Sequence, residues 1–499
     1  FLGRMGTIDT SRGCPFNCSF CTIINVQGRK MRHRSAECML ETIREHYAHG
    51  IIYYFFTDDN FSRSPVWPEL FEGLKQLRAE GIDVQFMMQV DTQAWRIKGF
   101  IEGAKEAGCV CVFIGMETIN EKNLIDADKR QNKVHQYAEM VESWHKSGML
   151  VHVGFIIGFP HDTVESVRGD LAMLRDQIKV DEASFFMLTP LPGSRDHLDM
   201  IKKGVPLDAD LNNYDSFHET FRHANIEPGD WYKLYIEAWD TFYAKEHVTN
   251  VLLRCPTERY WRMFWWAVWN RYADLNRSHS MITGFLRRKS RAERRPTFPG
   301  ETRAAFARRR VKDIGRETRI IAKMFFEYQE IFFLTYRRND PVGVVLAELR
   351  DIWFETKQRI EAMDISTQTD QAAEWLRATL RVVAHRFGEL SVNALTGTDQ
   401  VRRRLESITG EARGYLASLE DPTEENIQRA KAYIRDGVLP VYEALLFRNV
   451  GRCRRVNAYR EEMGARYRAG GLLNLGFWAR APRAIADQAV LGARFAYTF

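Results

Sequence analysis

Three cysteines near the start of the chain have a spacing that suits a metal centre. The stretch RGCPFNCSFC, residues 12–21, holds Cys14, Cys18 and Cys21 in the pattern C-x3-C-x2-C. A structural zinc site normally closes with four ligands, but the next cysteine, Cys38, lies in a predicted helix. On a cubane iron–sulfur cluster, three thiolates leave one iron able to bind a small molecule directly. We therefore favour a cluster, with zinc as the alternative.

The remaining cysteines are scattered and do not form a disulfide framework. Eight cysteines in 499 residues are typical of a reducing compartment, so we expect a cytoplasmic protein. Cys109 and Cys111 fall within a predicted strand, where cysteines usually serve as small core residues. Cys255 and Cys453 are isolated. The sequence therefore indicates a single cluster.

The cysteine loop follows the first of six predicted strands, which are short runs of β-branched and aromatic residues. The strands are Met5–Thr10, Ile51–Thr57, Val84–Gln89, Val110–Ile114, Val151–Ile157 and Ala183–Thr189. Helical patterns alternate with them, near residues 35–49, 67–80, 98–107, 133–147 and 163–177. Apolar strands that alternate with helices are typical of a parallel sheet covered on both faces. The sequence therefore predicts an α/β fold, an open (β/α)6 partial TIM-type barrel over residues 1–200.

The rest of the chain is predicted to be mainly helical. We divide it into a helical extension with aromatic and basic segments at 201–340 and a helical domain at 341–499. A hydrophobic content of 45% and a net charge of +6 are those of a globular protein, and exclude a fibre or a disordered tail. The sequence has no uncharged apolar run of about 18 residues, so no membrane-spanning helix is predicted. The first residue is Phe1, and we expect the natural chain to begin upstream.

Polar residues and glycines follow the predicted strands, at the edge where parallel α/β sheets bind ligands. They are Asp58, Asp59, Asn60, Gln89, Asp91 and Glu117, together with the segments GFIIGFP (154–160) and LTP (188–190). Each has a plainer explanation when taken singly, as a turn residue, a packing glycine or a solvated carboxylate. Their common position at successive strand ends predicts one ligand-binding mouth.

The cysteine loop, with Phe20 directly before its third cysteine, resembles the radical S-adenosylmethionine superfamily. The segments FFTDDNF, GMET, GFIIGFP and LTPLPGS resemble the branch whose members often carry a cobalamin-binding domain before the barrel. The resemblance implies that Cys14, Cys18 and Cys21 ligate a 4Fe-4S cluster whose fourth iron chelates S-adenosylmethionine. It implies reductive cleavage to methionine and a 5′-deoxyadenosyl radical, which takes a hydrogen atom from the substrate. It also implies an external electron donor such as flavodoxin or ferredoxin.

The same resemblance assigns cofactor contacts to residues that follow the strands. Asp58, Asp59 and Asn60 stand where the family usually has a Gly-Gly-Glu-like segment, and would accept hydrogen bonds from the methionyl ammonium. Glu117 stands where a ribose hydroxyl would need an acceptor.

The remaining implied contacts lie nearer the adenine. Gly154, Ile156 and Gly158 match a glycine-containing strand that lets adenine approach the backbone. Phe20 and Leu188 complete the implied cofactor contacts. The branch's cobalamin-binding domain and its histidine motif have no counterpart in these 499 residues, so cobalamin is an option that this chain does not support.

Gln89 and Asp91 are the candidate substrate contacts, because they follow the third strand and point into the mouth. Methylation of an unactivated carbon of a small or lipid-like substrate is the favoured reaction. A radical oxidoreductase or ring-forming step is the alternative, since both reactions begin with hydrogen abstraction. An iron–sulfur electron-transfer protein would leave the open coordination position and the polar strand ends unexplained.

Two segments of the helical part suggest a surface contact. Residues 287–319 hold 13 Arg or Lys against four acids. Residues 259–272, RYWRMFWWAVWNRY, predict one broad aromatic stripe on a helix, made of Tyr260, Trp261, Phe264, Trp265, Val268 and Trp269. Trp and Tyr favour the headgroup boundary and cations favour anionic lipid, so we predict peripheral membrane contact. The alternatives are that the stripe is core and the basic segment is a solvated face or an RNA contact, of which RNA is disfavoured.

Overall fold

The structure is a computed structural model of the chain, and it describes most of the 499 residues. The described ranges are 5–280, 283–284, 289–291, 300–336, 341–363, 369–392, 399–468 and 480–498. The chain divides into two compact units, Phe1–Ile321 and Ala322–Phe499. The predicted boundaries near residues 200 and 340 stay predictions.

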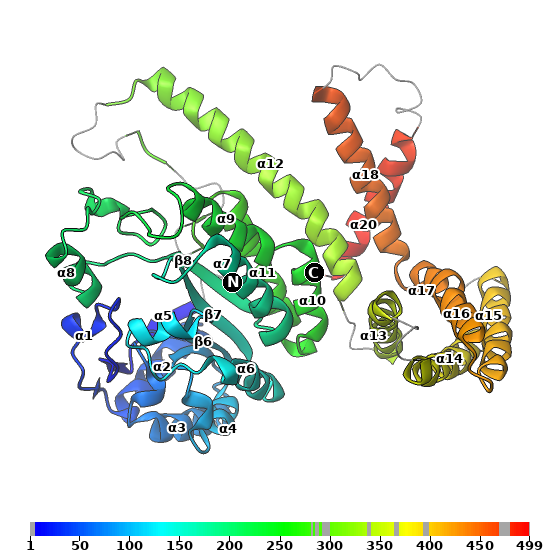
Figure 1. Cartoon of the computed structure of the whole chain (residues 1–499), viewed down its shortest axis with the longest axis horizontal. Helices are drawn as coiled ribbons and strands as arrows, with labels where there is room; N and C mark the ends of the chain where they lie inside the picture. The colour runs from blue at the N-terminus through cyan, green and yellow to red at the C-terminus, as the bar shows by residue number, and fades with distance from the viewer. Residues whose placement is uncertain are drawn as a thin grey trace. The chain divides into compact units, whose positions relative to one another are not determined.

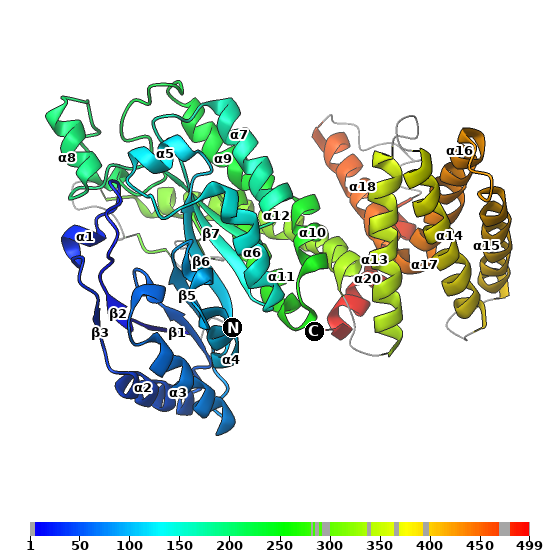
Figure 2. The ribbon, with the colours of Figure 1, turned by 60° about the horizontal axis from the view of Figure 1, so that its bottom comes forward.

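The first unit is built on a six-stranded sheet with the order β1-β4-β5-β6-β7-β8 (Figures 1 and 2). The strands are β1 (Met5–Ile8), β4 (Tyr53–Phe56), β5 (Gln85–Val90), β6 (Cys109–Glu117), β7 (Leu150–Ile157) and β8 (Glu182–Met187). Every neighbouring pair is parallel. The predicted open α/β half-barrel is therefore confirmed.

Helices connect consecutive strands and cover the outer face of the sheet. They are α2 (Ala36–Ala48), α3 (Trp67–Ala79), α4 (Phe100–Ala107), α6 (Tyr137–Lys146) and α7 (Val164–Met173). Local capping residues fix where they begin: the Ser35 side chain accepts a hydrogen bond from the Cys38 amide, and Thr163 and Ser166 form a capping box. Apolar side chains of the strands meet these helices, as in the ring contact of Phe86 with Phe71.

Shorter elements lie at the two edges of the barrel. The two-stranded β2 (Ser11–Arg12) and β3 (Arg32–His33) flank α1 (Ile23–Val26). The helices α5 (Glu121–Asp126) and α8 (Arg195–Lys202) follow β6 and β8.

The inner face of the sheet is partly accessible. In β5, Phe86, Met88 and Val90 are buried under the outer helices, whereas the alternating side chains of Met87 and Gln89 are only half-buried. The inner-face side chains of the neighbouring strands share this partial exposure; they are Phe55, Phe113, Ile156 and Phe186. Because side chains alternate between the two faces of a strand, the half-buried set lines one concave surface.

Helices α10 (Lys245–Arg254) and α11 (Tyr260–Leu275) lie at the amino ends of the strands, where Arg254 donates to the Val180 carbonyl at 2.6 Å, and α9 (Asp230–Phe242) packs along α7 and β8. The α11 guanidinium of Arg262 lies 4.1 Å from the ring centre of Tyr53 on β4 and donates to its hydroxyl. Tyr260 and Phe264 are buried, and Trp265 is 43% exposed. The predicted aromatic stripe therefore supplies core contacts through Tyr260 and Phe264, as the alternative interpretation held.

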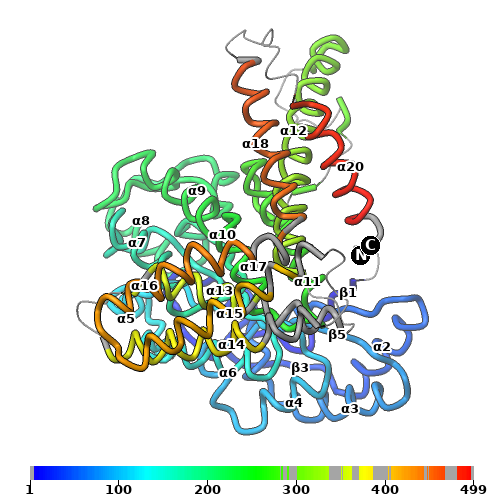
Figure 3. The backbone as a smooth tube through the Cα atoms, turned by 90° about the vertical axis from the view of Figure 1, so that its right-hand side faces the viewer, coloured from blue at the N-terminus to red at the C-terminus, as the bar shows by residue number. Residues whose placement is uncertain are grey.

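The second unit is helical, as predicted for this part of the chain. Its helices are α12 (Arg303–Thr335), which begins in the first unit, α13 (Pro341–Ala362), α14 (Thr369–Val392), α15 (Asp399–Ser418), α16 (Glu424–Tyr433), α17 (Leu439–Leu446), α18 (Arg448–Arg468) and α20 (Ala481–Thr498). Trp353, Leu376 and Ile434 belong to its main core, and α18 lies beside α20 (Figure 3). Among the described residues, no helix is long and apolar enough to cross a membrane.

Candidate functional site

The cysteine loop leaves the carboxyl end of β1 and is fixed at both of its ends. The pairing of β2 with β3 matches Ser11 with His33. The Cys14 amide donates to the Gly28 carbonyl over 3.2 Å. Gly13 has φ +103, and a Cβ there would lie 2.7 Å from the Lys30 carbonyl oxygen, so the loop requires glycine at this position.

Two aspartates that follow β4 hold the start of this loop. Asp58 is fully buried, and its carboxylate accepts from the Thr10 amide at 3.1 Å and from the Thr10 hydroxyl at 2.6 Å. The Ser11 hydroxyl donates to the same carboxylate. Asp59 accepts from the Gly13 amide at 2.9 Å. These contacts assign Asp58 and Asp59 a positioning role, and their predicted contact with the cofactor ammonium stays a prediction.

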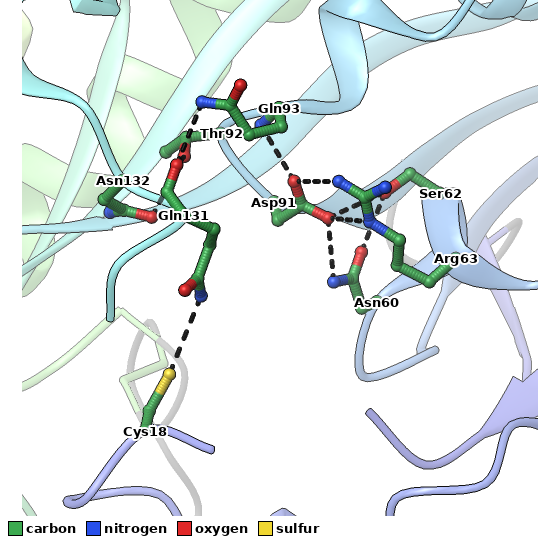
Figure 4. Close-up of polar contacts among 9 residues, drawn as sticks. All are labelled: Cys18, Asn60, Ser62, Arg63, Asp91, Thr92, Gln93, Gln131 and Asn132. Atoms are coloured by element: carbon green, nitrogen blue, oxygen red, sulfur yellow. Dashed lines mark hydrogen bonds and ion pairs between the residues drawn. The ribbon is translucent and has the colours of Figure 1, made fainter. Parts of the chain in front are cut away.

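Arg63 and Asp91 form a partly buried ion pair in the segments that follow β4 and β5 (Figure 4). Asp91 accepts from Arg63 Nε at 2.6 Å and from Arg63 Nη2 at 2.8 Å. It also accepts from Asn60 at 3.0 Å, from Ser62 at 3.1 Å and from the Gln93 amide at 2.8 Å. Burial opposes ionisation, but Arg63 and the other donors hold the pKa of Asp91 below its usual range.

This network affects the two predicted substrate contacts, Gln89 and Asp91, differently. Both oxygens of Asp91 are already occupied by protein donors, so the carboxylate orients Arg63 and Asn60. Gln89 is half-buried on the concave face, and its amide nitrogen donates to the Asp58 carbonyl at 3.1 Å. Of the two, Gln89 has the position that suits substrate contact, and this role stays a prediction.

Glu117 pairs with a buried lysine next to the cysteine loop. A register shift in β6 lies between Gly115 and Glu117, and Glu117 has φ +66. Its carboxylate accepts from Lys129 Nζ, which lies 5.6 Å from the ring centre of Phe20. Burial lowers the pKa of Lys129, but Glu117 and the thiols of Cys18 and Cys21 outweigh it and raise the pKa above its usual value.

Lys129 and its neighbours are the part of the site that the sequence analysis missed. They belong to the loop 128–132, which follows α5 and has no recognisable motif. Gln131 Nε2 lies 3.7 Å from Cys18 Sγ, and the Asn132 amide donates to the Met116 carbonyl at 2.8 Å (Figure 4). Its position in the chain could have pointed to it, because the loop follows the strand that ends in Glu117.

The glycines of β7 have packing explanations as well as the predicted cofactor role. Gly158 has φ +104, and a Cβ there would collide with the indole of Trp231, which donates to the Ile157 carbonyl at 2.9 Å. A Cβ on Gly154 would lie 3.0 Å from the Phe113 ring on the concave face. Their predicted contacts with adenine stay predictions.

The three other implied cofactor contacts lie near the same edge of the sheet. Ile156 is half-buried on the concave face. Leu188 is buried, and its amide donates to the Ile157 carbonyl at 2.9 Å. Phe20 meets the ring of Phe159 edge-on at 5.8 Å. The structure thus brings the cysteine loop and the end of β7 together through these two rings.

The donor chemistry of the loop fits an iron–sulfur cluster. Cys14, Cys18 and Cys21 form no disulfide, and the backbone folds tightly between the last two, since the Cys21 amide donates to the Cys18 carbonyl at 3.2 Å. Burial raises the pKa of Cys21 to about 11, and iron binding would supply the positive charge that thiolates need there. Among the described residues, no three such donors converge on one point. Each thiolate of a cubane cluster binds a different iron, so convergence on one point is not required.

Comparison with known proteins matches residues 8–174 to the radical SAM superfamily. Bacteriochlorophyllide d C-12(1)-methyltransferase of Chlorobaculum tepidum is 29% identical over 42% of this chain and 45% of that protein. An uncharacterized methyltransferase of Pyrococcus horikoshii is 28% identical over 49% of this chain and 52% of that protein. The structure of the radical S-adenosylmethionine methyltransferase TsrM of Kitasatospora setae aligns with 18% identity, covering 42% of this chain and 41% of that one, with a TM-score of 0.36. The chain spans about half the length of the curated relatives it matches.

Proposed function

We propose that this chain is a radical SAM enzyme that methylates an unactivated carbon of an apolar substrate, because residues 8–174 match the radical SAM superfamily. The superfamily binds a 4Fe-4S cluster and S-adenosylmethionine, and its members need an electron donor. The methyltransferase names of the relatives support the reaction type. The observation that carries the proposal is the placement of three thiols beside the Glu117–Lys129 pair, at the edge of a partly open apolar face.

Cys14, Cys18 and Cys21 would hold the cluster. When bound and reduced, the cluster supplies the electron that cleaves S-adenosylmethionine to methionine and a 5′-deoxyadenosyl radical. The chain's own residues position the loop that carries the thiols. Asp58 fixes Thr10 and Ser11 at its start, and the rings of Phe20 and Phe159 pack at its end.

Lys129 and Glu117 are suited to the charged end of S-adenosylmethionine. The carboxylate of S-adenosylmethionine, bound next to the cysteine loop, would lie close to the Lys129 ammonium. Because this ammonium is buried, it interacts strongly with a negative charge. The Glu117 carboxylate could then accept from a ribose hydroxyl. We propose that Glu117 keeps the Lys129 ammonium charged, and that their contact holds both side chains in place before the cofactor binds.

The concave face favours an apolar substrate. Its half-buried side chains Phe55, Met87, Phe113 and Phe186 are apolar, and Gln89 adds an amide next to the Asp58 carbonyl. Ligand sites of this kind combine apolar walls with a few polar groups that fix orientation. A small, largely apolar or lipid-like molecule with one hydrogen-bonding group suits this surface.

The products of S-adenosylmethionine test the reaction type. Methylation after hydrogen abstraction would consume it twice. One molecule takes one electron and gives methionine and 5′-deoxyadenosine. A second would transfer its methyl group to a carrier such as reduced cobalamin, at the cost of a second electron from the donor, and would leave S-adenosylhomocysteine. The reconstituted enzyme is reduced with dithionite or with flavodoxin and its reductase, and is supplied with a lipid extract and methyl-deuterated S-adenosylmethionine, with and without added cobalamin. We expect both nucleosides and a deuterated methyl group in one extracted molecule.

A matched pair of variants controls this assay. Cys18→Ser removes a thiol of the loop, whereas Cys38→Ser removes an exposed thiol of α2. We expect loss of both nucleosides in the first variant and unchanged amounts in the second. Formation of 5′-deoxyadenosine without S-adenosylhomocysteine in every arm would show that the enzyme performs radical oxidation or ring formation instead.

A further inference from the structure

The first part of α12 presents a face that the proposed reaction does not use. Residues 303–321 of this helix belong to the first unit, and the structure describes all of them (Figure 1). The face toward solvent contains both large aliphatic and basic side chains. The body-facing side contains the acids Asp313, which is half-buried and 3.0 Å from Lys289 Nζ, and Glu317, which is buried.

The aliphatic side chains form one stripe. Val311 is 73% exposed, Ile314 is 44% exposed and Ile321 is 36% exposed. Their separations of three and seven residues place them on one side of the helix, with exposed Thr318 between them. Single exposed aliphatic residues are ordinary, but an aligned set along three turns is typical of a helix that meets an apolar phase.

The basic side chains form a second stripe beside the first. Arg308, Lys312, Arg316 and Arg319 are exposed and are separated by four, four and three residues. Within residues 303–321, every one of which is described, no exposed position carries an acid. The exposed side of the helix therefore has one sign of charge, and its partner should be anionic.

We propose that this face of α12 docks on an anionic lipid surface, with the aliphatic stripe inserted among the acyl chains and the cations among the headgroups. A helix that is aliphatic on one stripe and basic beside it suits the plane of the membrane interface. Nucleic acid would bind the cations through its phosphates, but it would leave the aliphatic stripe exposed, because proteins bind its bases by stacking on aromatic side chains. The docking helix is thus α12, whereas the stripe of α11 contributes Tyr260 and Phe264 to the core.

Cosedimentation with vesicles tests this surface and does not depend on the cluster. The full chain is mixed with vesicles of phosphatidylcholine that contain roughly 30% phosphatidylglycerol, at low and at high salt. We expect it to pellet with these vesicles at low salt, to pellet less at high salt, and to stay in solution with pure phosphatidylcholine. Failure to pellet with anionic vesicles at low salt would overturn the proposal without affecting the proposed reaction.

Two matched pairs of variants separate the stripes. Lys312→Glu with Arg319→Glu should weaken vesicle binding by roughly 25-fold, since each cation contributes roughly fivefold. The control is Lys202→Glu with Lys203→Glu, which makes the same charge change on exposed residues at the end of α8. It should weaken binding by less than about threefold, because the same change of four charges, from +6 to +2, is made away from the docking face, where salt screens it. An equal loss in both pairs would show that net charge alone causes binding, and would overturn the proposal.

The aliphatic stripe is tested in the same way. Val311→Ser with Ile314→Ser should weaken vesicle binding by about tenfold or more. The control is Ile125→Ser with Ile485→Ser, which removes two aliphatic side chains of similar exposure, 60% and 68%, from other helices. If Val311→Ser with Ile314→Ser binds vesicles like the wild type, and an RNA oligonucleotide competes through Lys312 and Arg319, the face is a nucleic-acid surface and the proposal is wrong.

Discussion

The two ends of the barrel both bury acids and bases on the inner side of the sheet, but they treat charge in opposite ways. At the carboxyl ends of the strands, the pKa of Asp91 is lowered and that of Lys129 is raised, so both are charged. At the amino ends, burial lowers the pKa of His152 to about 3 and raises the pKa of Glu182 to about 8. The acid and the base there are both neutral near pH 7.

The difference follows from the partners that each end provides. Asp91 has the two-point contact of Arg63 together with three other donors. Glu182 has His152 Nδ1 at 3.4 Å, and the Arg262 guanidinium near it is stacked on Tyr53. Keeping a buried charge requires close donors, which Asp91 has and Glu182 lacks. Asp181, just before β8, also has close donors in His145 and Arg254, and its pKa is lowered. The inner-face pair of Glu182 and His152 is therefore neutral, whereas Asp91 and Lys129 are charged at the end that carries the thiols. A charged cofactor could therefore pair with opposite charges at the carboxyl ends of the strands, whereas the neutral groups at the amino ends serve the stability of the fold.

The largest expected effect comes from removing a core side chain at the amino ends of the strands. Phe264→Ala should lower the free energy of unfolding by about 4 kcal/mol, because Phe264 is fully buried in α11. Trp265→Ala, at a 43% exposed position in the same helix, should lower it by less than about 1 kcal/mol. Urea unfolding of both variants provides the comparison. Equal losses would mean that the exposed side of α11 is also a packing surface.

Breaking the ion pair at the end that carries the thiols should have the next largest effect. Arg63→Met leaves the buried Asp91 carboxylate without its main partner, and should lower the free energy of unfolding by about 3 kcal/mol. Arg96→Met, at an exposed position, should change it by less than about 0.5 kcal/mol. Both are measured by urea unfolding at pH 7. A small loss for Arg63→Met would contradict the claim that charge at this end depends on close partners.

The pH dependence of stability tests the neutral state of Glu182. Its pKa is raised from 4.5 to about 8 in the folded chain, so the folded chain holds a proton that the unfolded chain has lost between these values. Stability should therefore fall as the pH rises through this window, and be fully present below it. Glu182→Gln removes this titrating carboxyl group. Between pH 5 and 8, the free energy of unfolding of the variant should therefore fall about 1 kcal/mol less per pH unit than that of the wild type. Parallel pH curves would show that Glu182 is already ionised.

The smallest expected effect concerns cofactor affinity at the end that carries the thiols. Lys129→Met should weaken S-adenosylmethionine binding by about tenfold, because one charge-assisted contact is lost. Lys122→Met, on the exposed surface of α5, should bind like the wild type. Equilibrium dialysis of the reconstituted proteins gives both values, with thermal unfolding to confirm that each variant is folded. Unchanged affinity in Lys129→Met would restrict this lysine to a structural pairing with Glu117.

The sequence was sufficient for the sheet because strand-forming runs and helices alternate, and a parallel sheet then follows with few other arrangements. It also located the thiols, because their spacing is local. The hydrogen-bond partners of Asp58 and Asp91 could not be predicted from the sequence. Thr10 precedes Asp58 by 48 positions, and Arg63 precedes Asp91 by 28. Lys129 was missed for the same reason, because its contacts with Glu117 and Phe20 arise only after folding.

The helix α11 shows the limit of periodicity. A stripe of aromatic residues is the same in sequence whether it faces lipid or a neighbouring strand. The ring contact of Trp266 with His152, and that of Arg262 with Tyr53, depend on where the helix meets the barrel. The exposed aliphatic stripe of α12 was not recognised from the sequence. Its aliphatic residues are separated by Arg and Lys, so they do not form a continuous apolar segment.

We propose that the cysteine loop holds a 4Fe-4S cluster at the charged end of the barrel. The most direct test is iron and acid-labile sulfide analysis, with visible absorption, of the anaerobically reconstituted protein and its Cys18→Ser and Cys38→Ser variants. We predict about four irons per chain and reductive formation of 5′-deoxyadenosine in the wild type and in Cys38→Ser, and loss of both in Cys18→Ser. A colourless protein with stoichiometric zinc, or iron binding that survives Cys18→Ser unchanged, would contradict the account.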